Sequence, residues 1–117
     1  MTQPAFEPPS EGPAALVILC AVPADFDPEP LATDLVERSL AACVQTGLAV
    51  RSTYRWRGAT EKSEERLVLI KTTRRRFAEV ESAIRAVHPY DVPEIIALDV
   101  SAGHAPYLAW MAEGTAS

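Results

Sequence analysis

The sequence lacks the features that mark several broad classes of protein. No apolar run approaches the roughly 18 residues of a membrane-spanning helix, and the N-terminus has neither the basic nor the apolar segment of a secretory signal. Cysteine is scarce, with two among 117 residues. Without a secretory signal, this predicts free thiols in a reducing compartment. We therefore expect a cytoplasmic protein with no membrane partner.

Positive charge is scarce as well. Eleven Lys and Arg residues face sixteen Asp and Glu residues, and the net charge is −5 at pH 7, which argues against nucleic acid as a partner. The run of three arginines at 74–76 is typical of a solvated helix start. The sequence also has no Gly-rich phosphate loop, no nucleophile spaced to reach a base and no paired catalytic carboxylates. We accordingly predict a protein that is not an enzyme.

The residues that are present suit a single folded domain. The hydrophobic fraction is 48% and the charged fraction 23%, ordinary values for a globular protein. Residues 1–13 carry four prolines and little to bury, which predicts a flexible Pro-rich tail. Residues 14–117 then form one domain with one core.

The hydrophobic periodicity predicts seven elements. They are a strand over 15–22, a helix over 28–42, strands over 50–56 and 65–73, a helix over 77–87, a strand over 94–100 and a short terminal helix around 107–111. Asp27 followed by Pro28 indicates the first helix start, because a carboxylate caps the first turn and proline needs no N–H there. The order β-α-β-β-α-β is the split βαβ pattern. We predict an α+β, ferredoxin-like sandwich with two helices on one face of the sheet.

The strand over 50–56 has two contrasting faces. One parity holds Val50, Ser52, Tyr54 and Trp56, and arginines occupy most of the other. We expect Gly58 to begin a polar turn after this strand. Little chain remains to cover the second face of the sheet, and an aromatic strand left bare invites pairing with another copy. The sequence therefore predicts self-association.

The segment 88–94, His-Pro-Tyr-Asp-Val-Pro-Glu, concentrates polar groups at a rigid joint. Proline biases the residue before it away from the α region, so the second long helix should stop at His88. An imidazole, a phenol and two carboxylates then lie between a helix and a strand. Two interpretations remain open: a functional site, or a Pro-punctuated connection with a solvated histidine.

Several motifs occur together in one order. They are Leu40-Ala41-Ala42-Cys43, Tyr54-Arg55-Trp56-Arg57-Gly58, Lys71-Thr72-Thr73, the 88–94 segment and Tyr107-Leu108-Ala109-Trp110. Over about residues 15–113 the chain closely resembles the CutA family, the divalent cation tolerance proteins. The resemblance implies a homotrimer structurally similar to PII signalling proteins, a link to copper or other divalent cations, and no settled enzymatic activity.

Metal binding can be considered residue by residue, since thiolate and imidazole suit copper and zinc. Cys20 and His88 should lie at the same end of the sheet, and Cys43 about 15–20 Å from Cys20, which excludes a disulfide. The resemblance implies a metal site of a strand-end cysteine with two consecutive histidines. Val87 stands at the first histidine position. Cys20 and His88 therefore predict a weak copper or divalent cation site.

A second cluster follows from the resemblance, which implies a polar cleft between protomers. Its members are Tyr54, Trp56, Glu65, Lys71, Tyr90 and Glu94. Such groups could satisfy buried hydrogen bonds at a subunit contact or perform acid–base chemistry. Three functions remain open: a trimeric metal-tolerance protein, a PII-like sensor that holds a small molecule in this cleft, and an enzyme built on Lys71, Glu65 and His88.

Overall fold

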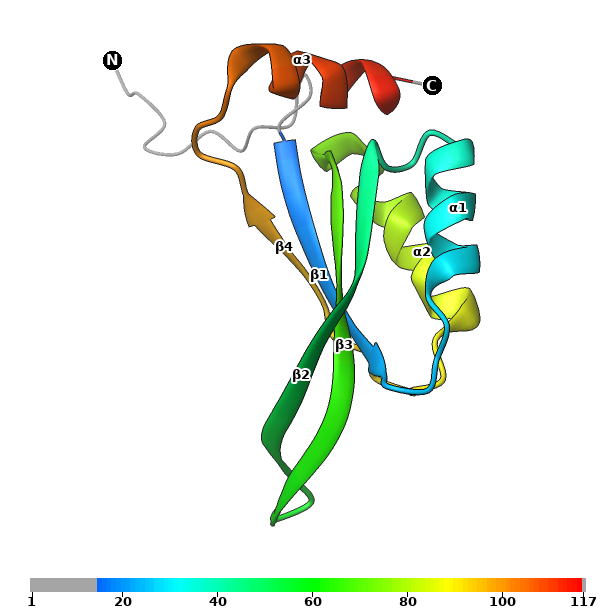
Figure 1. Ribbon diagram of the computed structural model, residues 1–117, viewed down its shortest axis with the longest axis vertical. Coiled ribbons are helices and arrows are strands. Elements are labelled where there is room, and N and C mark those ends of the chain that lie inside the picture. Colours follow the sequence, from blue (N-terminus) through cyan, green and yellow to red (C-terminus); the bar gives the residue numbers. More distant parts are fainter. Residues whose placement is uncertain (1–14, 117) are drawn as a thin grey trace, which may run out of the picture.

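The computed structural model describes residues 15–116, and the predicted Pro-rich tail at 1–13 lies outside this range. The elements are β1 (Ala15–Pro23), α1 (Glu29–Glu37), β2 (Cys43–Trp56), β3 (Ala59–Thr73), a 3-10 turn (Arg74–Arg76), α2 (Phe77–Val87), β4 (Ile95–Asp99) and α3 (Ala105–Gly114). Their order is the predicted one, including the terminal helix, and the α+β class is confirmed (Figure 1). None of the described helices is long and apolar enough to cross a membrane.

The four strands form one antiparallel sheet in the order β2-β3-β1-β4. Leu19 at the centre lies opposite Leu69 of β3 on one side and Ile96 of β4 on the other. Since residues directly opposite each other point to the same face, this register fixes which side chains share each face of the sheet.

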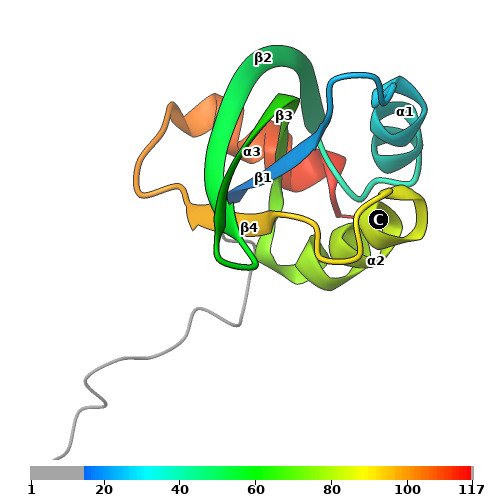
Figure 2. The ribbon, with the colours of Figure 1, turned by 90° about the horizontal axis from the view of Figure 1, so that it is seen from below.

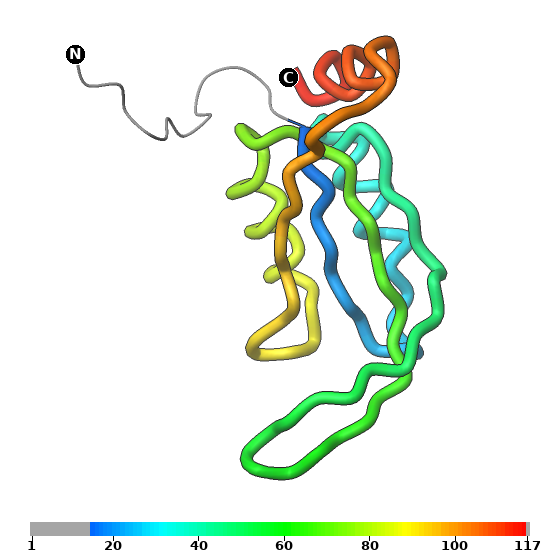
Figure 3. The backbone as a smooth tube through the Cα atoms, turned by 90° about the vertical axis from the view of Figure 1, so that its left-hand side faces the viewer, coloured from blue at the N-terminus to red at the C-terminus, as the bar shows by residue number. Residues whose placement is uncertain are grey.

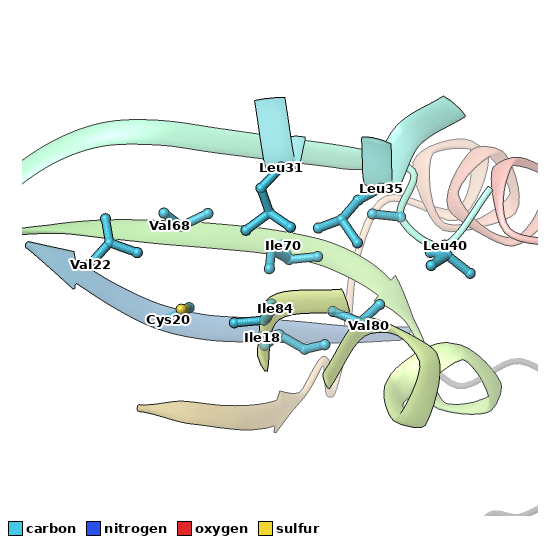
Figure 4. Packing of buried hydrophobic residues seen from close by; sticks show 11 residues of the cluster. Ile18, Cys20, Val22, Leu31, Leu35, Leu40, Val68, Ile70, Val80 and Ile84 are labelled. Carbon is cyan, nitrogen blue, oxygen red and sulfur yellow. The ribbon is translucent and has the colours of Figure 1, made fainter. Parts of the chain in front are cut away.

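Helices α1 and α2 cover one face of this sheet (Figure 2). The core between the two layers is apolar, and its buried members are Ile18, Cys20, Val22, Leu31, Leu35, Leu40, Ala41, Val68, Ile70, Val80 and Ile84 (Figure 4). Most come from alternate positions of β1 and β3 and from one stripe each of α1 and α2, as period-two strands and amphipathic helices require. Leu40 and Ala41 come from the connection between α1 and β2.

The first helix is shorter than predicted, and the prediction that it reaches residue 42 is wrong. Its start agrees closely, since the Glu29 N–H donates to Asp27 Oδ1 at 3.0 Å. At its end Ser39 adopts a left-handed conformation with φ 58°. The Leu40 N–H then donates to the Leu35 carbonyl and the Ser39 N–H to the Val36 carbonyl, which is a Schellman cap. A serine in a position that usually holds glycine conceals this stop in the sequence.

Strands β2 and β3 are both longer than predicted and form a hairpin that extends beyond the body of the domain (Figure 3). The expected polar turn is instead a two-residue turn of Arg57 (φ 52°) and Gly58 (φ 83°). Positive φ at both positions is the geometry that matches the twist of a hairpin. A register shift between Gln45 and Leu48 bends β2, and Cys43 begins this strand rather than ending a helix.

Within residues 15–116, no helix layer comparable to α1 and α2 covers the second face of the sheet, and α3 contacts the strands near Lys71. In Figure 3 the strands lie in front of α1, α2 lies at the β4 edge of the sheet, and α3 lies across its upper end. The large apolar side chains of the second face are partly exposed, and the most exposed are Ile96 at 50% and Leu98 at 53%. By the register they adjoin Leu19 and Val17 of β1, so the apolar surface is continuous across the strands. We call this surface, with Val17, Leu19, Leu67, Leu69, Ile96 and Leu98, the open face.

Candidate binding cleft

A cavity of about 660 Å³ lies at the hairpin end of the open face. Its floor includes Ala21 of β1, whose small side chain leaves room above the sheet. One wall comes from the hairpin and comprises Ser52, Thr53, Tyr54, Trp56 and Glu65. The other wall comes from the α2–β4 loop and comprises Tyr90, Asp91, Val92 and Glu94. Because the hairpin bends beneath this loop (Figure 3), two segments distant in sequence face one cavity.

Glu65 is the buried polar group at the centre of the cavity wall. Its residue is 7% exposed. Ser52 Oγ donates to Glu65 Oε1 at 2.5 Å and the Tyr90 hydroxyl donates to Oε2 at 2.9 Å. The loop and the hairpin are thus joined through one carboxylate, which fixes the width of the cleft.

Tyr90 titrates far from its ordinary range because of this arrangement. Burial and the hydrogen bond to Glu65 raise the pKa of the Tyr90 phenol from 10.0 to about 12. The phenol therefore stays neutral above pH 10, where an ordinary tyrosine ionises, and remains a donor to Glu65.

His88 ends α2 in an extended conformation, as the proline at 89 predicts. Its Nδ1 accepts a hydrogen bond from the Tyr90 N–H at 3.1 Å, so Nε2 carries the proton and donates to the Ala21 carbonyl at 2.8 Å. Both ring nitrogens of the neutral imidazole are engaged. His88 therefore links β1 to the loop that carries Tyr90.

Cys20 lies one residue from the cavity floor but on the opposite, helix-covered face. It is fully buried. Burial first, and then the Glu94 and Glu65 carboxylates, raise the pKa of the Cys20 thiol from 9.0 to about 12. The thiolate that a metal requires is accordingly disfavoured. Cys20 and Cys43 are both free, as predicted.

Cys20 and His88 would each have to give up a present interaction before they could hold a metal ion. The thiol is protonated and enclosed by the core, and the imidazole has no unused lone pair. Within residues 15–116, no three His, Cys, Asp or Glu side chains are grouped to hold a metal ion. The nitrogen ligand that Val87 replaces would have stood on an exposed helix end, since Val87 is 49% exposed.

Lys71 is separated from the rest of the predicted cleft cluster within one chain. Along β3 it lies opposite Val17, whereas Glu65 lies opposite Pro23, a separation of roughly 20 Å at about 3.3 Å per residue. Lys71 Nζ instead lies 3.5 Å from the hydroxyl of Tyr107 in α3. The trio of Lys71, Glu65 and His88 therefore does not meet in a single chain.

The other predicted members converge: Tyr54, Trp56, Glu65, Tyr90 and Glu94 all line the cavity. Sequence reasoning did not assign Ser52 to the site. Its shared parity with Tyr54 and Trp56 was a usable signal, because strand residues two apart point to the same face. Ala21 gave no such signal, since a small residue in a buried strand is unremarkable until the fold places it beneath a cavity.

Fold and cleft together define a small α+β protein with a four-stranded antiparallel sheet, helices on one face, and a cavity between a long hairpin and the α2–β4 loop. A sequence profile described as CutA1 divalent ion tolerance protein matches residues 16–114. The chain belongs to this family.

Relatives match over most of the domain. The chain is 41% identical over 99 residues to the divalent-cation tolerance protein CutA of Thermus thermophilus, which covers 85% of this chain and 96% of that protein. It is 38% identical over 100 residues to the CutA homolog of Xenopus laevis, covering 86% of this chain and 65% of that protein. It is 41% identical over 87 residues to human Protein CutA, covering 74% of this chain and 49% of that protein. The chain thus spans about half to two thirds of these two vertebrate relatives.

Solved structures agree with the fold. CutA1 from a psychrotrophic Shewanella species superposes with a TM-score of 0.83 at 37% identity, covering 92% of this chain and 100% of that one. The divalent cation tolerance protein of Thermus thermophilus superposes with a TM-score of 0.82 at 40% identity, covering 86% of this chain and 98% of that one.

Proposed function

We propose that the protein takes part in the response to divalent metal ions as a homotrimer, and that it acts by binding rather than by catalysis. Family membership supports the link to divalent cations. The homotrimer is inferred from the open face, which is a continuous apolar surface on one side of the sheet. Partly exposed aromatic residues extend it at both ends: Trp56 on the hairpin, and Tyr107 of α3, which contacts Lys71 of β3. Exposed apolar surfaces of this kind mark contacts with other chains.

Weak binding of copper or another divalent cation is part of this proposal. Cys20 would have to lose a strongly held proton, and His88 would have to release a hydrogen bond, so we expect a low affinity. The test is calorimetric titration of the reduced protein with copper and zinc. It is repeated on Cys20→Ser, His88→Ala and Cys43→Ser, and on Val87→His, which adds an unengaged imidazole.

The expected results are weak binding to the wild-type protein and tighter binding to Val87→His. Loss of binding only in Cys43→Ser would place the metal at the start of β2 and overturn the assignment.

The proposed location of the protein is the cytoplasm, where free thiols persist, and cell fractionation tests this location.

A second candidate function, a PII-like sensor that holds a small molecule, is favoured by the cavity. Its volume of about 660 Å³ lies in the range of small-molecule sites, and aromatic walls with a few convergent polar groups are typical of them. A ligand bound only by the native protein raises its melting temperature. A panel of metabolites screened by melting temperature tests this candidate.

A further inference from the structure

The cavity has one sign of charge. Three of its lining residues are carboxylic acids, Glu65, Asp91 and Glu94, and no Lys, Arg or His lines it within the described residues. Within one chain, an anionic ligand would meet repulsion from all three acids and no compensating cation. The ligand chemistry is therefore restricted to neutral or positively charged molecules.

Glu65 has no counter-charge among residues 15–116 of its own chain. Its carboxylate accepts bonds from two neutral hydroxyl groups, and no Lys, Arg or His of residues 15–116 forms an ion pair with it. The neighbouring Arg51 pairs with Glu64 at 3.0 Å on the opposite face of the hairpin. A buried carboxylate is costly unless it is paired. Each of its oxygens also has capacity for a further hydrogen bond.

We infer that the cleft binds a small organic cation, an amine carried on an apolar or aromatic body, with Glu65 as its counter-ion. This inference rests on the second candidate function and names its ligand class. The ammonium group donates to the free capacity of the Glu65 carboxylate. The body of the ligand lies against the tyrosines of the two walls, and aromatic faces attract cations. Arg57 already stacks on the Trp56 ring at 5.5 Å, which is the same type of contact at the rim.

A metal ion fits the same charges less well. Zinc sites in proteins use three or four protein donors, and residues 15–116 hold no group of three His, Cys, Asp or Glu suited to a metal ion. Both Glu65 oxygens are already oriented by hydroxyl donors, and Tyr54 and Trp56 supply ring surface rather than ligands. Breadth and aromatic walls favour a molecule with an apolar body.

The test uses three probes of one shape and different charge: 2-phenylethylamine, 2-phenylethanol and 3-phenylpropionate. Each is titrated into the full chain at neutral pH and followed by calorimetry. The amine should bind at least about tenfold more tightly than the alcohol, a difference that one charge-assisted hydrogen bond supplies. The propionate should not bind. Equal affinities for the amine and the alcohol, or no amine binding, would overturn the inference.

Variants assign the binding to the cleft. Glu65→Gln should weaken amine binding by about tenfold or more. Glu94→Gln, at an exposed position of the cleft, should weaken it by about threefold. Glu64→Gln is the matched control, because this neighbour faces the other side of the hairpin, and it should leave amine binding unchanged. If Glu65→Gln and Glu94→Gln both bind the amine normally, the inference fails.

The same proteins and probes also test two other possible partners for the Glu65 carboxylate: a basic side chain of a second protomer and a divalent metal ion. If a basic side chain of a second protomer neutralises Glu65, light scattering will show that Glu65→Gln weakens assembly while the amine does not bind. If a divalent ion occupies the cleft, magnesium or zinc will displace the amine at equal concentration. Either outcome overturns the inference. A trimer that binds no amine leaves the proposed assembly standing, so the two failures are distinguishable.

Discussion

Cys20 illustrates how position decides the chemistry of one side chain. In the sequence it is a soft metal ligand near the end of a strand. In the fold its side chain points into the core, and burial raises the pKa of its thiol to about 12. Ala21, the next residue, faces the cavity. A shift of one position along a strand therefore separates an inert core thiol from the floor of a binding site.

The free energy of unfolding should fall as the pH rises from about 9 to 12. The folded chain holds the Cys20 and Tyr90 protons up to a pKa of about 12, whereas their ordinary pKa values are 9.0 and 10.0. Between these pH values the unfolded state binds fewer protons than the folded state. The stabilisation that these two groups provide is therefore fully present below pH 9 and decreases as the pH rises to about 12. Cys20→Ala should lower stability throughout but flatten the slope, and Cys43→Ser should retain the slope. Urea unfolding at a fixed protein concentration measures both, and an unchanged slope in Cys20→Ala would contradict the assignment.

At the scale of elements, the sequence predicts which segments are helix or strand better than it predicts where they end. Helix α2 stops at the predicted residue because a proline follows His88. Helix α1 ends at Glu37, and Ser39 after it takes a left-handed conformation without the usual glycine. Arg57 in the β2–β3 turn also has a positive φ. The α1 stop is set by tertiary contacts: Leu40 beyond the cap and Leu35 within the helix are both buried in the core.

Ser39→Gly should stabilise the protein by about 0.5–1 kcal/mol. A left-handed conformation costs a non-glycine residue about 1–2 kcal/mol, part of which glycine loses again to the entropy of the unfolded chain. Ser101→Gly is the matched control, because Ser101 lies in the loop before α3 and is not among the positive-φ residues; it should be neutral or slightly destabilising. Chemical denaturation compares the two. Equal effects of both substitutions would rule out relief of backbone strain.

For the molecule as a whole, the cleft shows what a single sequence can and cannot predict. Five of the predicted cleft residues line the cavity. They could be predicted because the family resemblance assigns them to one cleft and because Tyr54 and Trp56 lie on the same face of β2. The separation of Lys71 from Glu65 depends on the register of β3 against β1. The cavity itself depends on a hairpin that bends beneath the α2–β4 loop. Both are long-range properties that local periodicity does not encode.

Ile96→Glu should dissociate the assembly. Ile96 is 50% exposed on the open face, so a charge there is tolerated by one chain but would be buried without a partner at a contact between chains. Val36→Glu is the control, since Val36 is 44% exposed on the helix side of the sheet. Sedimentation should show a loss of assembly of about tenfold or more for Ile96→Glu only. If both variants assemble like the wild-type protein, the open face is not the contact.

The mass of the protein in solution tests the central claim most directly. The open face and its aromatic ends predict a trimer, so light scattering at micromolar concentration should give three times the 12.7 kDa of one chain. The mass should persist on dilution, because an obligate contact buries above roughly 2,000 Å² in total. A mass of 12.7 kDa under these conditions would contradict the proposed assembly and leave the open face unexplained.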